Sequence, residues 1–159
     1  MLTLERLKET LEYNPETGHF IRIKPRSSVR VGDIAGYKCN GYISIEIDRN
    51  PYRAHRLAWF YTHGEWPAEH IDHINGDKMD NRLCNLREAT RSQNMMNSKV
   101  QKSNTSGLKG AYKRGRGYVS TIRMGGEEVY LGFFKTPEEA HAAYCKAADE
   151  HHKEFARHG

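Results

Sequence analysis

Cysteine and long apolar runs are both scarce in this sequence of 159 residues. The three cysteines, Cys39, Cys84 and Cys145, form no C-x-x-C pair, which argues against a disulfide framework and against a cysteine zinc site. No apolar run approaches the roughly 18 to 20 residues that span a membrane. The first ten residues lack the basic-then-apolar pattern of a secretory signal. We therefore expect a cytoplasmic protein with reduced thiols and no membrane partner.

An acidic surplus is also lacking, because 25 Lys and Arg face 20 Asp and Glu, for a formal net charge of +5. The surplus is local. Residues 99–135 hold eight basic side chains and two acids, Glu127 and Glu128, so this stretch carries +6 and all other residues sum to −1. Residues 20–54 hold seven basic residues and three acids. Two basic stretches predict two contacts with a polyanion, although solvated strand faces have the same composition.

Periodicity and turn residues predict an α+β fold with two modules. Helical spacing favours helices over residues 2–12, 55–63 and 90–98, and alternation favours strands over 19–24, 29–35, 41–47 and 70–74. The polar stretch 99–106 is typical of a linker. It would separate an N-terminal module, residues 1–98, from a C-terminal module, residues 107–159.

The C-terminal module is predicted to contain a small sheet followed by one helix. Glycine-rich turns separate three strands over about 109–114, 117–124 and 127–134. Thr136 and Glu139 have the spacing of a capping box, with Pro137 at the first helical position. Small residues recur on one side of this helix, which lets it lie close to the sheet.

The segment from Ile71 to Asn97 is dense in Asp and Asn. Phosphodiester cleavage needs a base that activates water and a cation that holds the phosphate. Asp72 and His73 are neighbours on a predicted strand, so their side chains point to opposite sides. Asn94, on the predicted helix, could supply a second oxygen, and such a pair suits Mg²⁺. Turn chemistry alone is the alternative; a calcium loop is disfavoured because Ile74 and Gly76 occupy ligand positions.

Asp72-His73, Asn85 and Asn94, in this order, resemble the ββα-metal motif of HNH endonucleases, in the variant of phage homing endonucleases. The flanking text HRLAWFYTHGEWP and DNRLCNLREATRSQN resembles that family as well. The resemblance implies that His73 is the general base, that Asp72 and Asn94 ligate one divalent cation, and that Asn85 holds the loop and orients His73. Asn in place of His at the last position favours Mg²⁺, with Mn²⁺ as the alternative, over zinc.

Residues 106–159 resemble the Apetala-type (AP2) DNA-binding domain. The landmarks include Ser106-Gly107, Leu131-Gly132-Phe133 and the stretch TPEEA from Thr136. The resemblance implies a three-stranded antiparallel sheet that lies in the DNA major groove and packs on one helix. It assigns DNA contacts to Lys109, Tyr112, Arg114, Arg116, Thr121, Arg123 and Tyr130. Tyr112 and Glu128 stand where the family usually has Arg, so base preference does not transfer. A small interaction domain with solvated basic strands is the alternative.

Other residues receive weaker interpretations. Further DNA contacts are conceivable at Arg22, Lys24, Arg26, Arg30 and Arg53 in the N-terminal strands, and at Lys99 and Lys102 in the linker. For His55, His63 and His70 we expect packing or capping roles. Asn75, Asn81 and Asn97 are expected to satisfy backbone groups.

These patterns together predict an endonuclease that acts on double-stranded DNA, by a nick or a double-strand cut. A monomer is slightly favoured over a dimer, and a phage-encoded enzyme in a bacterial host cell is expected. A non-catalytic AP2-type DNA-binding regulator with a vestigial nuclease module is the alternative, and a protein-interaction module is the third.

Overall fold

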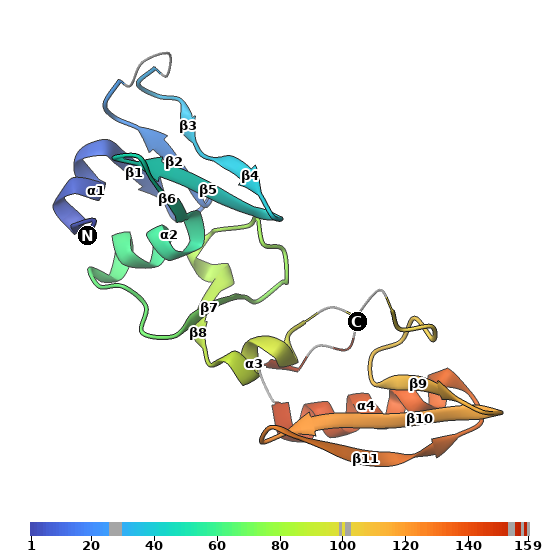
Figure 1. Ribbon diagram of the computed structural model, residues 1–159. Helices are drawn as coiled ribbons and strands as arrows, with labels where there is room; N and C mark the ends of the chain where they lie inside the picture. Colours follow the sequence, from blue (N-terminus) through green and yellow to red (C-terminus); the bar gives the residue numbers. More distant parts are fainter. Residues whose placement is uncertain (26–29, 99, 101–102, 153–154, 157, 159) are drawn as a thin grey trace. The chain divides into compact units, whose positions relative to one another are not determined.

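The computed structural model describes all residues except 26–29, 99, 101–102, 153–154, 157 and 159 (Figure 1). The chain divides into two compact units, a first unit, Met1–Ala89, and a second unit, Thr90–Gly159. Both contain helices and small antiparallel sheets, so the predicted α+β class is confirmed. Arg26, Lys99 and Lys102, predicted to meet DNA, lie outside the described residues. None of the helices in the described part is long and apolar enough to span a membrane.

The first unit begins with a short helix and a three-stranded sheet. Helix α1 (Leu4–Thr10) is capped by Thr3, whose hydroxyl accepts a hydrogen bond from the Arg6 amide at 3.2 Å. The predicted helix over 2–12 is too long, because Leu11 leaves helical geometry and begins β1. Strands β1 (Leu11–Asn14), β2 (His19–Arg22) and β3 (Ile34–Ala35) pair antiparallel in that order.

A second sheet packs on helix α2, and both contribute buried side chains to the apolar core of the first unit. It contains β4 (Tyr37–Cys39), β5 (Tyr42–Ile47) and β6 (Asn50–Arg53). Alternation along β5 buries Ile45 and Ile47, as expected. Helix α2 (Ala54–His63) follows directly and buries Leu57 and Ala58. It ends at Gly64, which adopts the left-handed conformation.

The HNH-like segment forms a two-stranded sheet in the first unit. Strand β7 (His70–His73) pairs antiparallel with β8 (Leu86–Ala89), and the 3₁₀ turn η1 (Leu83–Asn85) precedes β8. The sequence predicts β7 but not β8, whose four residues show no clean alternation. The pairing sets Arg87 opposite Asp72 and Leu86 opposite His73.

The second unit contains a capped helix, a three-stranded sheet and a long helix. Helix α3 (Arg91–Met96) carries a capping box between Thr90 and Gln93. Strands β9 (Ala111–Arg114), β10 (Gly117–Met124) and β11 (Glu127–Phe134) pair antiparallel in the order β11-β10-β9. Helix α4 (Pro137–His152) covers one face of this sheet. The predicted limits of β10, β11 and the start of α4 are confirmed. The linker expected over 99–106 stays a prediction.

Local interactions explain why the sequence predicts these element boundaries of the second unit correctly. Gly125 and Gly126 both have positive φ and close the β10–β11 hairpin. The Thr136 hydroxyl accepts the Glu139 amide at 3.2 Å, and the Glu139 carboxylate accepts the Thr136 amide at 3.3 Å. The core between sheet and helix consists of Ile122, Tyr144, Ala147 and Ala148.

Candidate active site

Strand β7 carries Asp72 and His73, the predicted metal ligand and the predicted general base. His70 at its start is exposed, whereas Asp72 and His73 at its end are buried. The turn η1, which precedes the partner strand β8, ends at Asn85. The structure therefore brings Asp72, His73 and Asn85 together in the first unit.

The His73 imidazole is held by an asparagine and by a second histidine. Its Nε2 lies 3.2 Å from Oδ1 of Asn81. An amide oxygen only accepts, so this contact assigns the hydrogen to Nε2 and the lone pair to Nδ1. The ring of His55 meets that of His73 edge-on, with centroids 5.0 Å apart. Burial lowers the pKa of His73 below its usual value, against the opposing effects of Asn81 and nearby carboxylates. The imidazole is therefore neutral at neutral pH.

Asp72 forms a buried ion pair across the β7–β8 hairpin. Its Oδ2 accepts hydrogen bonds from Nε and Nη2 of Arg87, at 3.0 and 2.9 Å. The pairing follows from the register, because Arg87 lies directly opposite Asp72. The guanidinium compensates the charge of a carboxylate that is 4% exposed.

Asn85 ties the loop after β7 at both of its ends. Its Oδ1 accepts the Asn75 amide at 2.9 Å, and its Nδ2 donates to the Asp80 carbonyl at 2.8 Å. The backbone carbonyl of Asn85 accepts the Ile74 amide at 2.9 Å. The loop that carries Asn81 is thereby fixed beside β7. The Asn85 side chain thus bonds the loop, whereas the side chain that bonds the His73 imidazole is that of Asn81, and the orienting role that the family resemblance gives Asn85 stays a prediction.

The hairpin β1–β2 braces the same loop from outside. The Tyr13 hydroxyl donates to the Asn81 carbonyl at 2.7 Å, and burial raises the pKa of Tyr13 to about 12, so it stays a donor. The Leu83 amide donates to the Pro15 carbonyl at 3.2 Å. A Cβ on Gly18 would lie 2.5 Å from the backbone nitrogen of Arg82. Only glycine lets this turn approach the loop so closely.

Three residues of this site make contacts that the sequence does not predict. Asn81 is predicted to form hydrogen bonds with backbone groups, and its Nδ2 does donate to the Met79 carbonyl at 3.2 Å. Its Oδ1, however, bonds the His73 imidazole. The sequence does not point to Arg87, because it does not predict strand β8, on which Arg87 lies. His55 is predicted to pack, and it is buried, but its partner is the proposed base. The signal available for Arg87 and His55 is their place inside the two flanking stretches that resemble the HNH family.

The predicted metal ligands provide suitable donor atoms. Asp72 offers a carboxylate and Asn94 an amide oxygen, both hard ligands that fit Mg²⁺ or Mn²⁺. Asn94 is half-buried on α3 and belongs to the second unit, so its pairing with Asp72 at one ion stays a prediction. Within the described parts of the chain, no three His, Cys, Asp or Glu side chains gather into a metal cluster.

The second unit presents an open sheet face opposite helix α4. The strand register places Tyr112, Thr121, Arg123, Tyr130 and Phe133 on this face. Tyr112, Tyr130 and Phe133 are between 49 and 61% exposed, and Arg123 is exposed as well. Ile122 points to α4. Val119 also lies on the open face, but it is buried, and Tyr112 and Phe133 lie directly opposite it on the neighbouring strands. Arg114 and Arg116 are exposed at the β9–β10 turn.

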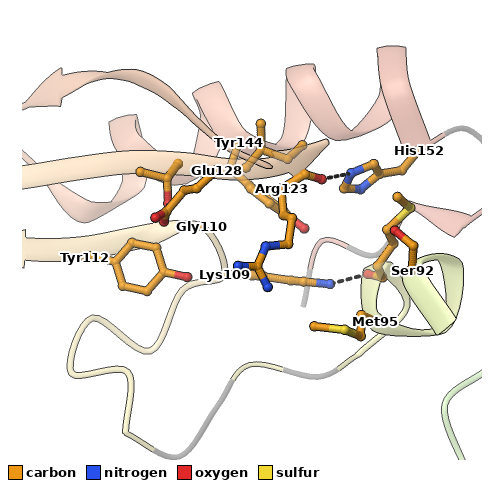
Figure 2. A pocket seen from close by; sticks show the side chains of 12 residues that line it. Ser92, Met95, Lys109, Gly110, Tyr112, Arg123, Glu128, Tyr144 and His152 are labelled. Atoms are coloured by element: carbon orange, nitrogen blue, oxygen red, sulfur yellow. Dashed lines mark hydrogen bonds between the residues drawn. The ribbon is translucent and has the colours of Figure 1, made fainter. Parts of the chain in front are cut away.

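Lys109 has a different environment from the other predicted DNA contacts. Its Nζ donates to the Met96 carbonyl at the end of α3, at 2.6 Å. Figure 2 shows Lys109, Tyr112 and Arg123 around a pocket of about 250 Å³ that Ser92 and Met95 of α3 also line. Lys109 is thus hydrogen-bonded to the end of α3. Phe133, one of the AP2 landmarks, is an exposed aromatic residue that the sequence does not assign to a DNA contact.

Comparison with known proteins identifies the segment that holds the site. A family model described as HNH endonuclease matches residues 52–96. The chain is 33% identical over 107 residues to Protein 3.8 of Escherichia phage T7, which covers 59% of this chain and 88% of that protein. It is 31% identical over 120 residues to an uncharacterized HNH endonuclease of Acanthamoeba polyphaga mimivirus, over 74% of this chain and 62% of the relative. No solved structure matches the sequence. The matched segment contains Asp72, His73, Asn85 and Asn94, so the chain carries an HNH endonuclease domain and is a DNA nuclease.

Proposed function

We propose that this nuclease is a metal-dependent, homing-type endonuclease that hydrolyses phosphodiester bonds in double-stranded DNA. The observation that carries the proposal is the state of His73. It is a buried, neutral imidazole, oriented by Asn81 and placed next to Asp72 within the HNH segment.

His73 acts as the general base. Its Nδ1 takes a proton from water while the water oxygen forms a bond to phosphorus. The bond between phosphorus and the leaving oxygen of the deoxyribose breaks in line, and the proton stays on the imidazole. Asn81 fixes which ring nitrogen can accept the proton, because its amide oxygen accepts a hydrogen bond from Nε2–H and leaves the lone pair on Nδ1.

Asp72 and Asn94 are the residues that would hold the divalent ion. Such an ion supplies positive charge that stabilises the phosphate and the departing oxygen. Arg87 holds the Asp72 carboxylate through two hydrogen bonds and thereby fixes the position of its oxygens. The guanidinium also competes with a cation for this carboxylate, so Arg87 sets how tightly the ion binds.

The open sheet face of the second unit is proposed to bind duplex DNA, in the manner of an AP2 domain. Exposed basic residues surround exposed aromatic rings there, and the stretch from residue 99 to 135 carries +6. Replacing Arg114, Arg116 and Arg123 with Gln is expected to weaken duplex binding and to flatten its salt dependence, by about 0.9 in log–log slope for each phosphate that is no longer neutralised. An unchanged slope in a fluorescence anisotropy titration would refute this role.

The alternative of a non-catalytic DNA-binding regulator draws support from one observation, since Arg87 already pairs with the Asp72 carboxylate. Incubating supercoiled plasmid with the full chain separates the two functions. The nuclease converts the plasmid to open or linear forms with Mg²⁺ and leaves it intact with EDTA. A regulator binds the plasmid and leaves it intact in both buffers.

A further inference from the structure

Tyr42 connects the proposed base to a second group of side chains. It is the first residue of β5 and is half-buried. Its ring centroid lies 5.3 Å from that of His55 and 6.2 Å from that of His73. The rings of Tyr42, His55 and His73 therefore form one packed wall in the first unit.

Two cations converge on the ring of Tyr42. The Arg53 guanidinium carbon lies 5.0 Å from the ring centroid, and the Lys78 ammonium lies 4.7 Å from it. They come from different elements, because Arg53 ends β6 and Lys78 belongs to the loop after β7. Contacts of this length with an aromatic face hold a cation in place.

Neither cation forms an ion pair with an acid in the described part of the chain. Nη1 of Arg53 donates to neutral acceptors, the Cys39 carbonyl at 2.8 Å and the Ser44 hydroxyl at 3.1 Å. Lys78 is exposed. Asp80, in the same loop as Lys78, pairs with Arg82 at 2.6 Å.

Two cations that lie beside one ring without an ion-pair partner repel each other, and a shared anion relieves the repulsion. We propose that Arg53, Lys78 and Tyr42 form a phosphate-binding subsite that holds a backbone phosphate next to the one attacked from His73. The inference rests on the proposed function, because it takes DNA as the substrate. The contacts of Tyr42 with His55 and His73 couple the position of this phosphate to that of the base.

Lys78 is the residue to test, because its side chain is exposed and its replacement leaves the core intact. The probe is a short fluorescein-labelled DNA duplex, titrated with the full chain in EDTA over a range of salt concentrations. Lys78→Gln is expected to lower the log–log salt slope by about 0.9, the value for one phosphate that is no longer neutralised. Lys78→Arg is expected to keep the wild-type slope.

Lys8→Gln is the matched control. Lys8 is also exposed, and its ammonium lies 5.2 Å from the ring centroid of a tyrosine, Tyr61, but it is on α1. This variant should bind as the wild type does. If Lys78→Gln keeps the wild-type slope, or if Lys8→Gln flattens it as much, the subsite is refuted.

Plasmid cleavage with Mg²⁺ supplies the second measurement. A contact made equally in the ground and transition states raises KM and leaves kcat unchanged when it is removed, and this is the expected result for Lys78→Gln. A loss of kcat with unchanged binding would place Lys78 on the attacked phosphate and overturn the proposal. A wild type that binds duplex but never cuts would refute the proposed function, while the titration in EDTA still decides the subsite.

Discussion

His73 and His55 lie in ring contact inside the first unit, and burial acts on both imidazoles in the same direction. Burial lowers the pKa of His73, and it lowers that of His55 to about 3, with further lowering from His73, Arg56 and Arg53. His55 is 8% exposed, and its Nδ1 is buried without a hydrogen-bond partner among the described residues. Both histidines are thus neutral at pH 7, as a base and its packing neighbour must be.

His55 makes the stability of the first unit depend on pH. The unfolded chain takes up a proton on His55 below its ordinary pKa of 6.5, whereas the folded chain does so only near 3. Stability from this group is therefore complete above pH 6.5 and is lost as the pH falls toward 3. Between pH 7 and pH 5 the loss is about 2 kcal/mol.

Urea unfolding of the wild type and of His55→Phe at both pH values measures this contribution. The variant keeps a buried ring but cannot titrate, so its unfolding free energy should fall less between pH 7 and pH 5. Equal losses in the two proteins would show that the His55 imidazole does not stay neutral in the fold.

Asn81 sets the orientation of His73 through one hydrogen bond of 3.2 Å. Asn81→Ala is expected to slow plasmid cleavage by about 10- to 100-fold, the usual cost of losing a group that orients a reactive side chain. Duplex affinity in EDTA should be unchanged. Asn50→Ala serves as the control, because the Asn50 side chain donates to the Asp48 carbonyl within its own turn. A variant that binds DNA more weakly but cuts at the wild-type kcat would contradict this role.

At the scale of elements, the position of the loop after β7 depends on a hairpin more than fifty residues earlier in the chain. The turn between β1 and β2 reaches the loop through Pro15, Tyr13 and Gly18. Gly18 has φ +74, and its Cα faces the backbone of Asn81 and Arg82. A Cβ there would strain the turn and push the backbone that carries Asn81.

Two glycine substitutions separate these effects. Gly18→Ala is expected to cost several kcal/mol and to slow cleavage, because the loop must shift. Gly41 has φ +77 but nothing within 4 Å of an added Cβ, so Gly41→Ala should cost only the left-handed strain of about 1 kcal/mol. Thermal unfolding and plasmid cleavage are measured for both. Equal destabilisation of the two variants would show that Gly18 does not brace the loop.

The elements also show how far sequence reasoning reaches. The boundaries of strands β10 and β11 and the start of helix α4 are predicted, because glycine turns and a capping box fix them locally. Strands β1, β4, β6 and β8 are missed, since each is short and owes its geometry to its pairing partner. The same limit applies to the site. Motif order points to Asp72, His73 and Asn85, whereas Arg87 and Asn81 act through cross-strand and loop contacts that spacing does not encode.

At the scale of the whole molecule, charge and chemistry lie in different parts of the chain. The +6 stretch contains the strands of the second unit, while His73 and its partners belong to the first. Phosphate contacts govern affinity, and they do not involve the proton that His73 is proposed to remove. Binding and cutting should therefore be separable by substitution within one full-length protein.

The most direct test measures DNA binding and DNA cleavage by His73→Ala, with His70→Ala as the matched control. His70 lies on the same strand but is exposed. With Mg²⁺, we predict that His73→Ala loses plasmid cleavage, keeps wild-type duplex affinity and folds normally, while His70→Ala cuts as the wild type does. Cleavage by His73→Ala at the wild-type rate would contradict the assignment of His73 as the general base.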